Sequence, residues 1–241
     1  KKKQAPTKEA ELVKKAGTIL CSSLYQAKDM AQQYPSSAQR IFHFPHGVDD
    51  SFINIDAKRN ITPPSVCIIG ALSVRYDWEL IYSVIKQLPN VLFKFVGDFD
   101  QKRQIDSSSR WRKLARLIFM LPNVLHVRDN GYYETRHYYW NSSVSWMPYR
   151  ADLLFVKACC PLKLMDGIAS GKPVISADVP ECRLYPEWVR IYRNTDEAVV
   201  LLRAALDEVT PSQRVAEQLQ FAQNNTWLLR AEELVNMIEN Q

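Results

Sequence analysis

Glycine is scarce in this sequence, with 7 among 241 residues, and the glycine-rich loops that hold phosphates are missing. Neither G-x-G-x-x-G nor G-x-x-x-x-G-K-[ST] occurs, although dinucleotide-binding domains and P-loop proteins depend on such loops. The G-x-S-x-G turn that presents a nucleophilic serine is also absent. The sequence therefore argues against a standard dinucleotide-binding domain, a P-loop protein and a hydrolase with that serine turn.

Cysteine and histidine are too few and too scattered to predict a metal site. The cysteines number 5, without a C-x-x-C pair, and this odd count argues against a complete disulfide framework. Cys67 lies in an apolar run and is expected in the core, whereas Cys159 and Cys160 are adjacent, which is poor geometry for a metal site. The 4 histidines are not at metal-ligand spacing, and we expect His43 and His46 to shape a loop. Reduced thiols are typical of a cytosolic protein.

Long apolar runs are also missing. No run of about 18 apolar residues is present, so no membrane-spanning helix is predicted, and no signal peptide is found. The sequence starts with KKKQAPTKEAELV, without methionine, and we expect it to begin inside a longer protein. The net charge of +5 suits an anionic ligand or a phospholipid surface but is too small to indicate nucleic acid. A soluble protein without such a partner is the alternative.

Apolar strands and helices alternate along most of the chain. The N-terminal part predicts a helix, a strand, a helix and a further short strand, at 8–16, 18–23, 24–34 and within 40–49. After a proline-containing linker at 60–65, strands are predicted at 66–70, 91–97, 124–129, 144–149, 173–178 and 189–193. Helices are predicted at 77–88, 109–121, 133–141, 162–170, 196–208 and 211–239. Near-continuous apolar strands between helices are typical of a parallel sheet covered on both faces, so we predict an α/β, doubly wound fold.

Ligands of doubly wound sheets bind beyond the carboxyl ends of the strands. Three strand-end glycines, Gly70, Gly97 and Gly131, fall on this rim. A single glycine would fit any turn, but three on one rim favour a binding site. The rim is expected to comprise residues 70–75, 97–98, 130–133 and 149–163.

The segment PLKLMDGIASGKPVISADVPE, residues 161–181, predicts a helix that leads through a glycine turn into a buried strand. Pro161 fits the first helical turn, whose free N–H groups and dipole favour an anion. Lys163 adds a positive charge that suits a pyrophosphate, and Asp166, one turn later, could accept hydrogen bonds from two vicinal hydroxyls such as those of a ribose. The alternative is that Lys163 is a solvated surface residue paired with Asp166.

The end of the same helix has a structural explanation. Gly171 is expected to end it in the left-handed conformation, and Lys172 is expected to satisfy its last carbonyls. Pro173 would then block the helix and start the strand.

Several motifs, in the expected order, resemble those of the GT-B glycosyltransferases. Residues 161–181 resemble the nucleotide-sugar motif P-x-K-x-x-E-x-x-A-x-G-K-P-V, and HGVDDSF (46–52) is similar to the linker N-G-V-D-x-x-x-F. IIGALSVRYDWELI (68–81) is similar to the first strand and helix of the donor domain. The segments 121–149 and 221–235 resemble later motifs, so the resemblance covers nearly the whole chain.

The resemblance implies two Rossmann-like domains with the active site in the cleft between them. Residues 1–45 would be the tail of the N-terminal acceptor domain, 46–65 the linker, 66–220 the C-terminal nucleotide-sugar-binding domain and 221–241 the closing helix. The rest of the acceptor domain, with any catalytic base, would lie upstream of Lys1. The catalytic residues are therefore unknown, and we expect this chain alone to be inactive.

The resemblance also implies roles for single residues. Asp166 takes the place of the glutamate that holds the ribose hydroxyls, while Lys163 and the backbone of Leu162 would meet the pyrophosphate. The rim after Gly131 would hold the base. The implied donor-binding residues are Gly70, Arg75, Gly131, Tyr132, Leu162, Lys163 and Asp166, and no metal is implied.

Two positions depart from the family pattern. Ala158 stands where many relatives carry a second glutamate. Ala71 replaces the common arginine of a basic pair, and Arg75 is the nearest candidate for its lysine. These departures leave open whether the sugar configuration is retained or inverted.

The implied function is transfer of a sugar from a UDP- or GDP-linked donor to a glycan or lipid-linked acceptor, as in polysaccharide or capsule biosynthesis. One alternative is a non-catalytic domain of the same fold that acts as the partner of an active transferase. Another is a nucleotide-sugar epimerase, which explains the linker less well. Cytoplasmic location is expected, with a peripheral position at the inner face of the cell membrane as a further option, and without nucleic acid as a partner.

The basic helix SRWRKLARLIFML, residues 109–121, suggests a contact with an anionic membrane. Its four cations, at 110, 112, 113 and 116, alternate with apolar residues, which suits the headgroup layer. The stronger alternative is that this helix covers the sheet and buries its apolar face.

Overall fold

The computed structural model describes residues 7–53, 61–99, 110–128, 131–208 and 212–239. They form a six-stranded sheet in the order β5-β4-β3-β6-β7-β8 and a two-stranded sheet of β1 and β2. All of these strand pairs are parallel. The strands are β1 (Ile19–Cys21), β2 (Ile41–His43), β3 (Ser65–Ile69), β4 (Leu92–Val96), β5 (Val124–Val127), β6 (Val144–Met147), β7 (Val174–Ala177) and β8 (Val189–Tyr192).

The order of the larger sheet is that of a doubly wound Rossmann fold. Counted from β3, the strands lie in the order 3-2-1-4-5-6, and the direction of winding reverses between β3 and β6. Ligands of such folds bind outside the carboxyl ends of the strands at this reversal point. The predicted α/β doubly wound class is confirmed.

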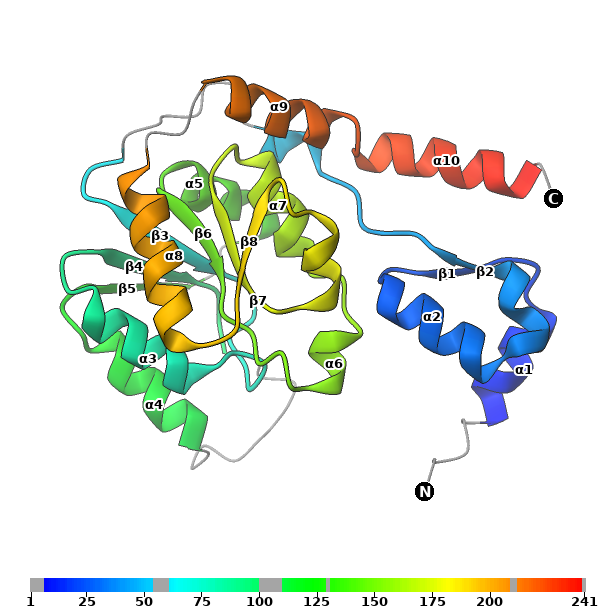
Figure 1. Cartoon of the computed structure of the whole chain (residues 1–241), viewed down its shortest axis with the longest axis horizontal. Helices are drawn as coiled ribbons and strands as arrows, with labels where there is room; N and C mark the ends of the chain where they lie inside the picture. Colours follow the sequence, from blue (N-terminus) through cyan, green and yellow to red (C-terminus); the bar gives the residue numbers. More distant parts are fainter. Residues whose placement is uncertain (1–6, 54–60, 100–109, 129–130, 209–211, 240–241) are drawn as a thin grey trace.

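Helices cover both faces of the larger sheet (Figure 1). One face packs against α3 (Trp78–Gln87), α4 (Arg110–Phe119) and α8 (Thr195–Asp207). The other packs against α5 (Thr135–Trp140), α7 (Leu162–Ala169) and α9 (Ser212–Gln223). The remaining helices are α1 (Thr7–Lys15), α2 (Leu24–Gln33), α6 (Leu154–Lys157) and α10 (Trp227–Glu239), together with short 3-10 turns at Pro35–Arg40, Asp50–Phe52, Tyr132–Glu134 and Pro180–Leu184.

Strand β3 shows why its sequence is apolar throughout. Val66 and Ile68 point into the core on the α3 side, whereas Cys67 and Ile69 point into the core on the α7 side. Because successive side chains of a strand face opposite ways, a strand covered on both faces needs apolar residues at every position. Cys67 is fully buried, as its apolar surroundings predicted.

Two predictions about helices were wrong. The long helix expected at 211–239 is two helices, because the backbone at 225–227 pairs with Val48 instead of continuing the helix. Val48 N donates to the Asn225 carbonyl at 2.8 Å, and Trp227 N donates to the Val48 carbonyl at 2.9 Å. The closing helix therefore begins at Trp227 rather than at residue 221. The short helix α6 was not predicted, because a single turn carries no periodic pattern.

Helix α4 covers the sheet. Ala115 and Ile118 are buried, and Trp111 and Leu114 pack against the same core. Leu117 remains exposed on the outer side. Most of the apolar face of α4, which the sequence suggested could contact a membrane, is therefore buried against the sheet.

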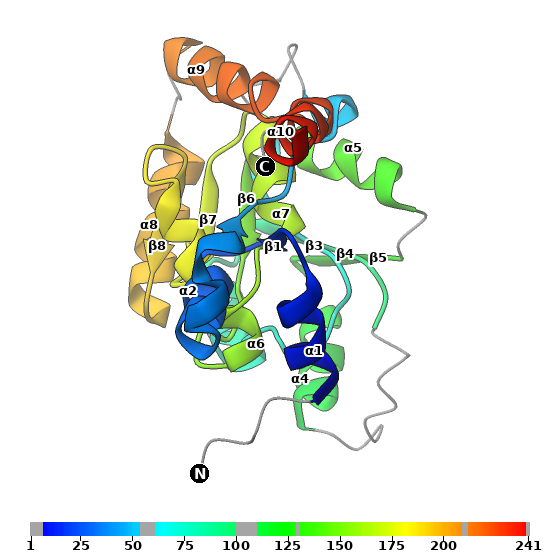
Figure 2. The ribbon, with the colours of Figure 1, turned by 90° about the vertical axis from the view of Figure 1, so that its right-hand side faces the viewer.

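The two-stranded sheet with α1 and α2 forms a smaller unit beside the larger sheet (Figures 1 and 2). Helix α10 leaves α9 toward the side of this unit, and none of its residues is buried. Within the described part of the chain, no helix has both the length and the apolar character needed to cross a membrane.

Candidate nucleotide-binding site

The N-terminus of α7 opens at the carboxyl ends of the strands, near the reversal between β3 and β6. Pro161 is the N-cap, with φ −70° and ψ 125°, and Leu162 is the first helical residue. The sequence predicted proline inside the first turn, but its extended ψ places it one position earlier. Lys163 lies in the first turn of this helix, whose free N–H groups and dipole favour a negative charge.

Gly70, the residue after β3, lies against the Lys163 side chain. A Cβ atom on Gly70 would lie 2.6 Å from Lys163 Cε, and the Gly70 φ of +126° is also one that other residues rarely adopt. Gly97, after β4, has φ +137° and would place a Cβ only 2.3 Å from the Gly70 carbonyl oxygen. The two strand-end glycines therefore let the Lys163 side chain pass over the end of the sheet.

Arg75, Leu162 and Lys163 line one pocket of about 220 Å³. Arg75 Nε donates to Ser73 Oγ at 3.1 Å, and its guanidinium lies 5.1 Å from the centre of the Phe155 ring. Two cations in one pocket at a helix N-terminus favour an anionic ligand. The structure thus brings three of the sequence-predicted residues together.

Asp166 is the buried acidic group of the site, with an exposed fraction of 3%. The Tyr132 hydroxyl donates to Asp166 Oδ1 at 2.9 Å. Burial raises the pKa of Asp166 to about 7, while the Tyr132 hydrogen bond and the Lys163 charge oppose that rise. Asp166 thus accepts its hydrogen bond from Tyr132, and Lys163 acts on it through its charge. The alternative considered from the sequence, an ion pair of Lys163 and Asp166 on the surface, does not describe Asp166, because this residue is buried.

Gly131 starts the turn that carries Tyr132. Its φ is +123°, yet a Cβ atom there would meet nothing within 4 Å, so conformation alone favours glycine. The Tyr132 ring packs on Phe52, which lies between β2 and β3, with ring centres 4.8 Å apart. The site therefore has a second cluster of predicted residues, made of Gly131, Tyr132 and Asp166. Its connection to the pocket is Lys163, which lines the pocket and whose charge acts on Asp166.

Several residues at the pocket were not singled out by the sequence. His46, Tyr149, Phe155, Cys159 and Cys160 also line it. Four of these fall in the predicted rim range 149–163, but the sequence of this segment carries no motif that distinguishes them. Burial lowers the pKa of His46, which favours its neutral form, and the Glu181 charge opposes this effect.

Glu181 joins this rim to the smaller unit, and sequence reasoning missed it. Its exposed fraction is 1%. One carboxylate oxygen lies 2.7 Å from His43 Nε2, and the other accepts from the Leu24 N–H at 2.8 Å. Ser23 Oγ also donates to the Ala158 carbonyl at 2.7 Å. His43 therefore does more than shape a loop, since it pairs with a buried carboxylate.

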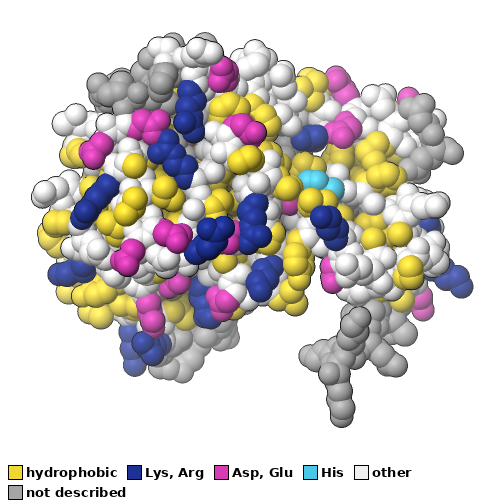
Figure 3. Space-filling model, viewed as in Figure 1, with side chains coloured by type: hydrophobic (Ala, Val, Ile, Leu, Met, Phe, Trp, Pro, Cys, Tyr) yellow, Lys and Arg dark blue, Asp and Glu magenta, His cyan; other side chains and the backbone are white. Residues whose placement is uncertain are grey.

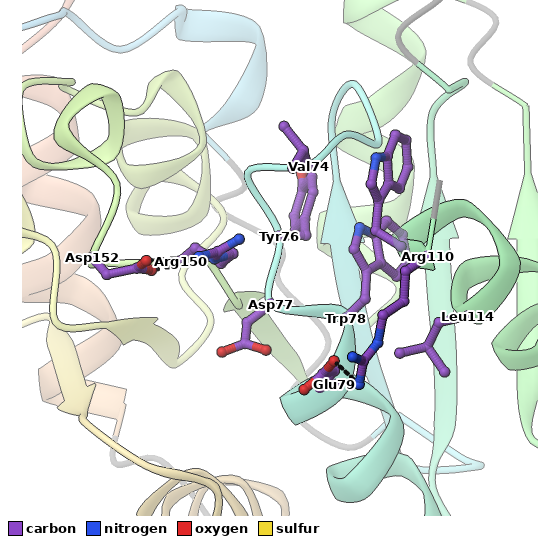
Figure 4. Close-up of a pocket in the computed structure, with 10 residues that line it drawn as sticks. Val74, Tyr76, Asp77, Trp78, Glu79, Arg110, Leu114, Arg150 and Asp152 are labelled. Carbon is purple, nitrogen blue, oxygen red and sulfur yellow. Dashed lines mark hydrogen bonds and ion pairs between the residues drawn. The ribbon is translucent and has the colours of Figure 1, made fainter. Parts of the chain in front are cut away.

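A neighbouring pocket of about 510 Å³ lies beside the N-termini of α3 and α4 (Figure 4). None of the predicted donor-binding residues lines it. Both of its arginines are paired, Arg110 with Glu79 at 2.7 Å and Arg150 with Asp152 at 2.7 Å, and Asp77 adds a further carboxylate. Figure 3 shows the same mixture of Lys, Arg, Asp and Glu side chains across this face of the molecule. The smaller pocket at Lys163 is the better candidate for an anion.

A metal centre has no support among the described residues. No group of three or more His, Cys, Asp or Glu side chains there is arranged to hold a metal ion.

No family model matches the chain. Among curated proteins it is similar to TuaH of Bacillus subtilis (strain 168), provisionally named a teichuronic acid biosynthesis glycosyltransferase. The two are 24% identical over 212 residues, which cover 85% of this chain and 51% of TuaH. The chain thus spans about half the length of this curated relative.

Two solved structures show the same fold. Sucrose-phosphate synthase from Thermosynechococcus elongatus matches with a TM-score of 0.73 and 18% identity, covering 96% of this chain and 60% of that one. HepE from Anabaena, solved in complex with UDP and glucose, matches with a TM-score of 0.69 and 12% identity, covering 95% of this chain and 65% of that one. The resemblance predicted from the motifs is confirmed, and the chain has the fold of the GT-B glycosyltransferases, with glycosyltransferases as its relatives in sequence and in structure.

Proposed function

We propose that the protein containing this chain transfers a sugar from a nucleotide-sugar donor to a glycan or lipid-linked acceptor in polysaccharide or glycoconjugate biosynthesis, such as that of a capsule. The observation that carries the proposal is the position of Lys163. It lies in the first turn of α7, beside Arg75, where the strand order of the sheet reverses.

These residues suit the departure of a nucleoside diphosphate. As the bond from the sugar to the diphosphate breaks, negative charge grows on the leaving oxygen. Lys163, Arg75 and the first N–H groups of α7 would stabilise that charge without reorganising, which is how fixed charges lower a reaction barrier. Binding the donor in this cleft would also orient the sugar toward its acceptor.

A UDP-linked donor is our first choice of substrate, with a GDP-linked donor as the alternative. The choice of UDP is supported by HepE, which was solved with UDP and glucose and shares the fold of this chain.

Calorimetric titration of the full protein with UDP and GDP tests the donor site. Lys163→Ala should weaken binding of the preferred nucleotide by roughly 1–3 kcal/mol, because a charge-assisted contact with phosphate is lost. Lys86→Ala is a matched control, since Lys86 is an exposed lysine on α3. The absence of binding heat with either nucleotide at millimolar concentration, or equal affinities of the two variants, would contradict the proposed site.

A second candidate function is that of a non-catalytic partner of an active transferase. It is favoured by Ala158, which lacks the carboxylate that the family pattern expects and whose carbonyl accepts from Ser23. Nucleotide binding alone does not separate the two functions. Hydrolysis of UDP-glucose by the full protein in the absence of acceptor does, because a non-catalytic domain would release no UDP.

Contact with an anionic membrane, on its cytoplasmic side, is a separate proposal. It is supported by three exposed cations of α4, Arg110, Lys113 and Arg116, although most of the apolar face of that helix is buried. Flotation with vesicles that contain acidic lipid, at low and high salt, tests it. Binding that is independent of lipid charge, or that survives reversal of Arg110, Arg112 and Lys113, would exclude α4 as the contact.

A further inference from the structure

Two pockets outside the candidate nucleotide pocket share part of their walls. One, of about 510 Å³, lies beside the N-termini of α3 and α4, and the other, of about 430 Å³, lies at the carboxyl ends of β6, β7 and β8. Asp77, Arg150 and Asp152 line both. Figure 4 shows Asp77 between the Arg150–Asp152 pair and Glu79. The two pockets therefore adjoin, and together they are called the rim groove.

The rim groove leads to the candidate nucleotide pocket. Tyr149 lines both the pocket of about 430 Å³ and the pocket that contains Lys163. The backbone N–H of Arg150, in the groove, donates to the carbonyl of Arg75, in the nucleotide pocket, at 2.8 Å. A chain molecule that lies in the groove would thus have one end beside the nucleotide.

Ion pairs join most of the charged side chains of the rim groove. The pairs are Arg110 with Glu79, Arg150 with Asp152, and both Arg183 and Arg193 with Asp178. A ligand ion of either sign would meet like charges as well as opposite ones, so the groove favours an uncharged ligand. Carboxylates and guanidinium groups keep acceptor and donor positions that one ion pair does not use. The ligand should therefore carry groups that both donate and accept, as hydroxyls do.

Trp111 adds an aromatic wall to the rim groove. Its ring is half-buried and packs on the buried Trp78, with ring centres 6.0 Å apart and planes inclined by 19°. Leu114 lines the same pocket. A sugar ring has hydroxyls around its edge and C–H groups on its faces, so it can contact an aromatic ring and polar side chains at once. The lining of the groove suits a sugar ring in both respects.

We propose that the rim groove binds uncharged sugar units of a glycan acceptor, so that the reacting end of the glycan reaches the nucleotide pocket at Lys163. Both pockets fall within the roughly 300–1,000 Å³ that is typical of small-molecule sites, which leaves room for more than one sugar unit. Sugar binding in the groove does not need the nucleotide, whereas the role of these sugars as acceptor rests on the proposed function. The acceptor class recognised by this chain is thus a glycan rather than a lipid.

The test is a ligand-observed NMR titration of the full protein with maltotetraose, cellotetraose and tetra-N-acetylchitotetraose, and with the disaccharide of each. At least one tetrasaccharide should bind about tenfold more tightly than its disaccharide, because only the longer chain spans both pockets. Glu79→Gln in one pocket and Arg183→Gln in the other should each weaken that binding about three- to tenfold, because a charged hydrogen-bonding group is lost. Glu187→Gln and Arg203→Gln are matched controls, since both residues are exposed and line neither pocket. Thermal unfolding of each variant confirms that it is folded.

The outcomes separate this inference from the proposed function. Failure of all three tetrasaccharides to bind would overturn the inference, and so would binding that neither groove variant weakens. Tighter binding of tetragalacturonate than of every uncharged tetrasaccharide would contradict an uncharged ligand. A parallel titration with UDP tests the donor site alone. UDP binding without sugar binding would remove the groove and keep the proposed function, whereas sugar binding without UDP binding would keep the groove and remove the donor site.

Discussion

Gly70 is the residue on which the position of Lys163 depends. Its missing side chain leaves the space through which the Lys163 methylenes pass, since a Cβ would lie 2.6 Å from Lys163 Cε. The backbone there has φ +126°, so glycine is favoured both by conformation and by contact. A single small residue thus connects the end of a core strand to the charge of the candidate site.

We predict that Gly70→Ala destabilises the protein by roughly 1–3 kcal/mol, through backbone strain and the clash with Lys163. It should also weaken UDP binding, because the lysine must move. Urea unfolding and calorimetry measure the two effects. Gly17→Ala is the control, since a Cβ there meets nothing within 4 Å and its φ is ordinary. Wild-type stability and affinity in Gly70→Ala would show that the rim adjusts freely.

Both ends of helix α7 are fixed by residues outside the helix, which its helical periodicity does not reveal. Pro161 caps the start, and Gly171, with φ +69°, turns the chain after the end. The last carbonyls were expected to be satisfied by Lys172. The buried Gln218 of α9 donates to the carbonyl of Ile168, in the last turn of α7, and to that of Lys172, beyond its end, at 2.9 and 3.0 Å. Helix α9 therefore locks the helix that carries the candidate site.

We predict that Gln218→Leu lowers the free energy of unfolding by roughly 1–3 kcal/mol, because two buried carbonyls each lose a hydrogen bond. Gln220→Leu, two positions further on the exposed side of α9, should change it little. Urea unfolding followed by circular dichroism compares the two. Equal stabilities would mean that water or another donor replaces the amide without cost.

At the scale of the whole molecule, the smaller unit is tied to the rim of the larger sheet through Glu181. This carboxylate is buried and contacts the Leu24 N–H and His43, which belong to the start of α2 and the end of β2. A buried carboxylate is tolerated only when its oxygens are satisfied, so the smaller unit and the larger domain stabilise each other here.

Glu181→Ala should loosen the smaller unit while leaving the larger sheet folded. We expect the Leu24 amide to exchange with solvent at least about tenfold faster, because its acceptor is lost. Hydrogen exchange followed by mass spectrometry reports on residues 19–43 separately from the rest. Glu187→Ala, an exposed change in the same connection, is the control. Unchanged protection of residues 19–43 would show that other contacts hold the smaller unit.

The sequence alone determined most of the elements and the fold class. Apolar runs with intervening helical spacing predicted each strand from β3 to β8, because a strand buried on both faces must be apolar at every position. The glycines after β3 and β4 and the proline before α7 were visible as well, since backbone conformation is a local property. Lys163 followed from the same local pattern at the helix start.

Only the tertiary structure decided which residues meet. The break between α9 and α10 depends on Val48, far earlier in the chain, and the hydrogen bond on Asp166 comes from Tyr132 in another loop. The contacts of Glu181 are made with α2 and β2 of the smaller unit. Such contacts join residues distant in sequence, and they form only after the sheet order and the packing of its helices have placed the loops side by side.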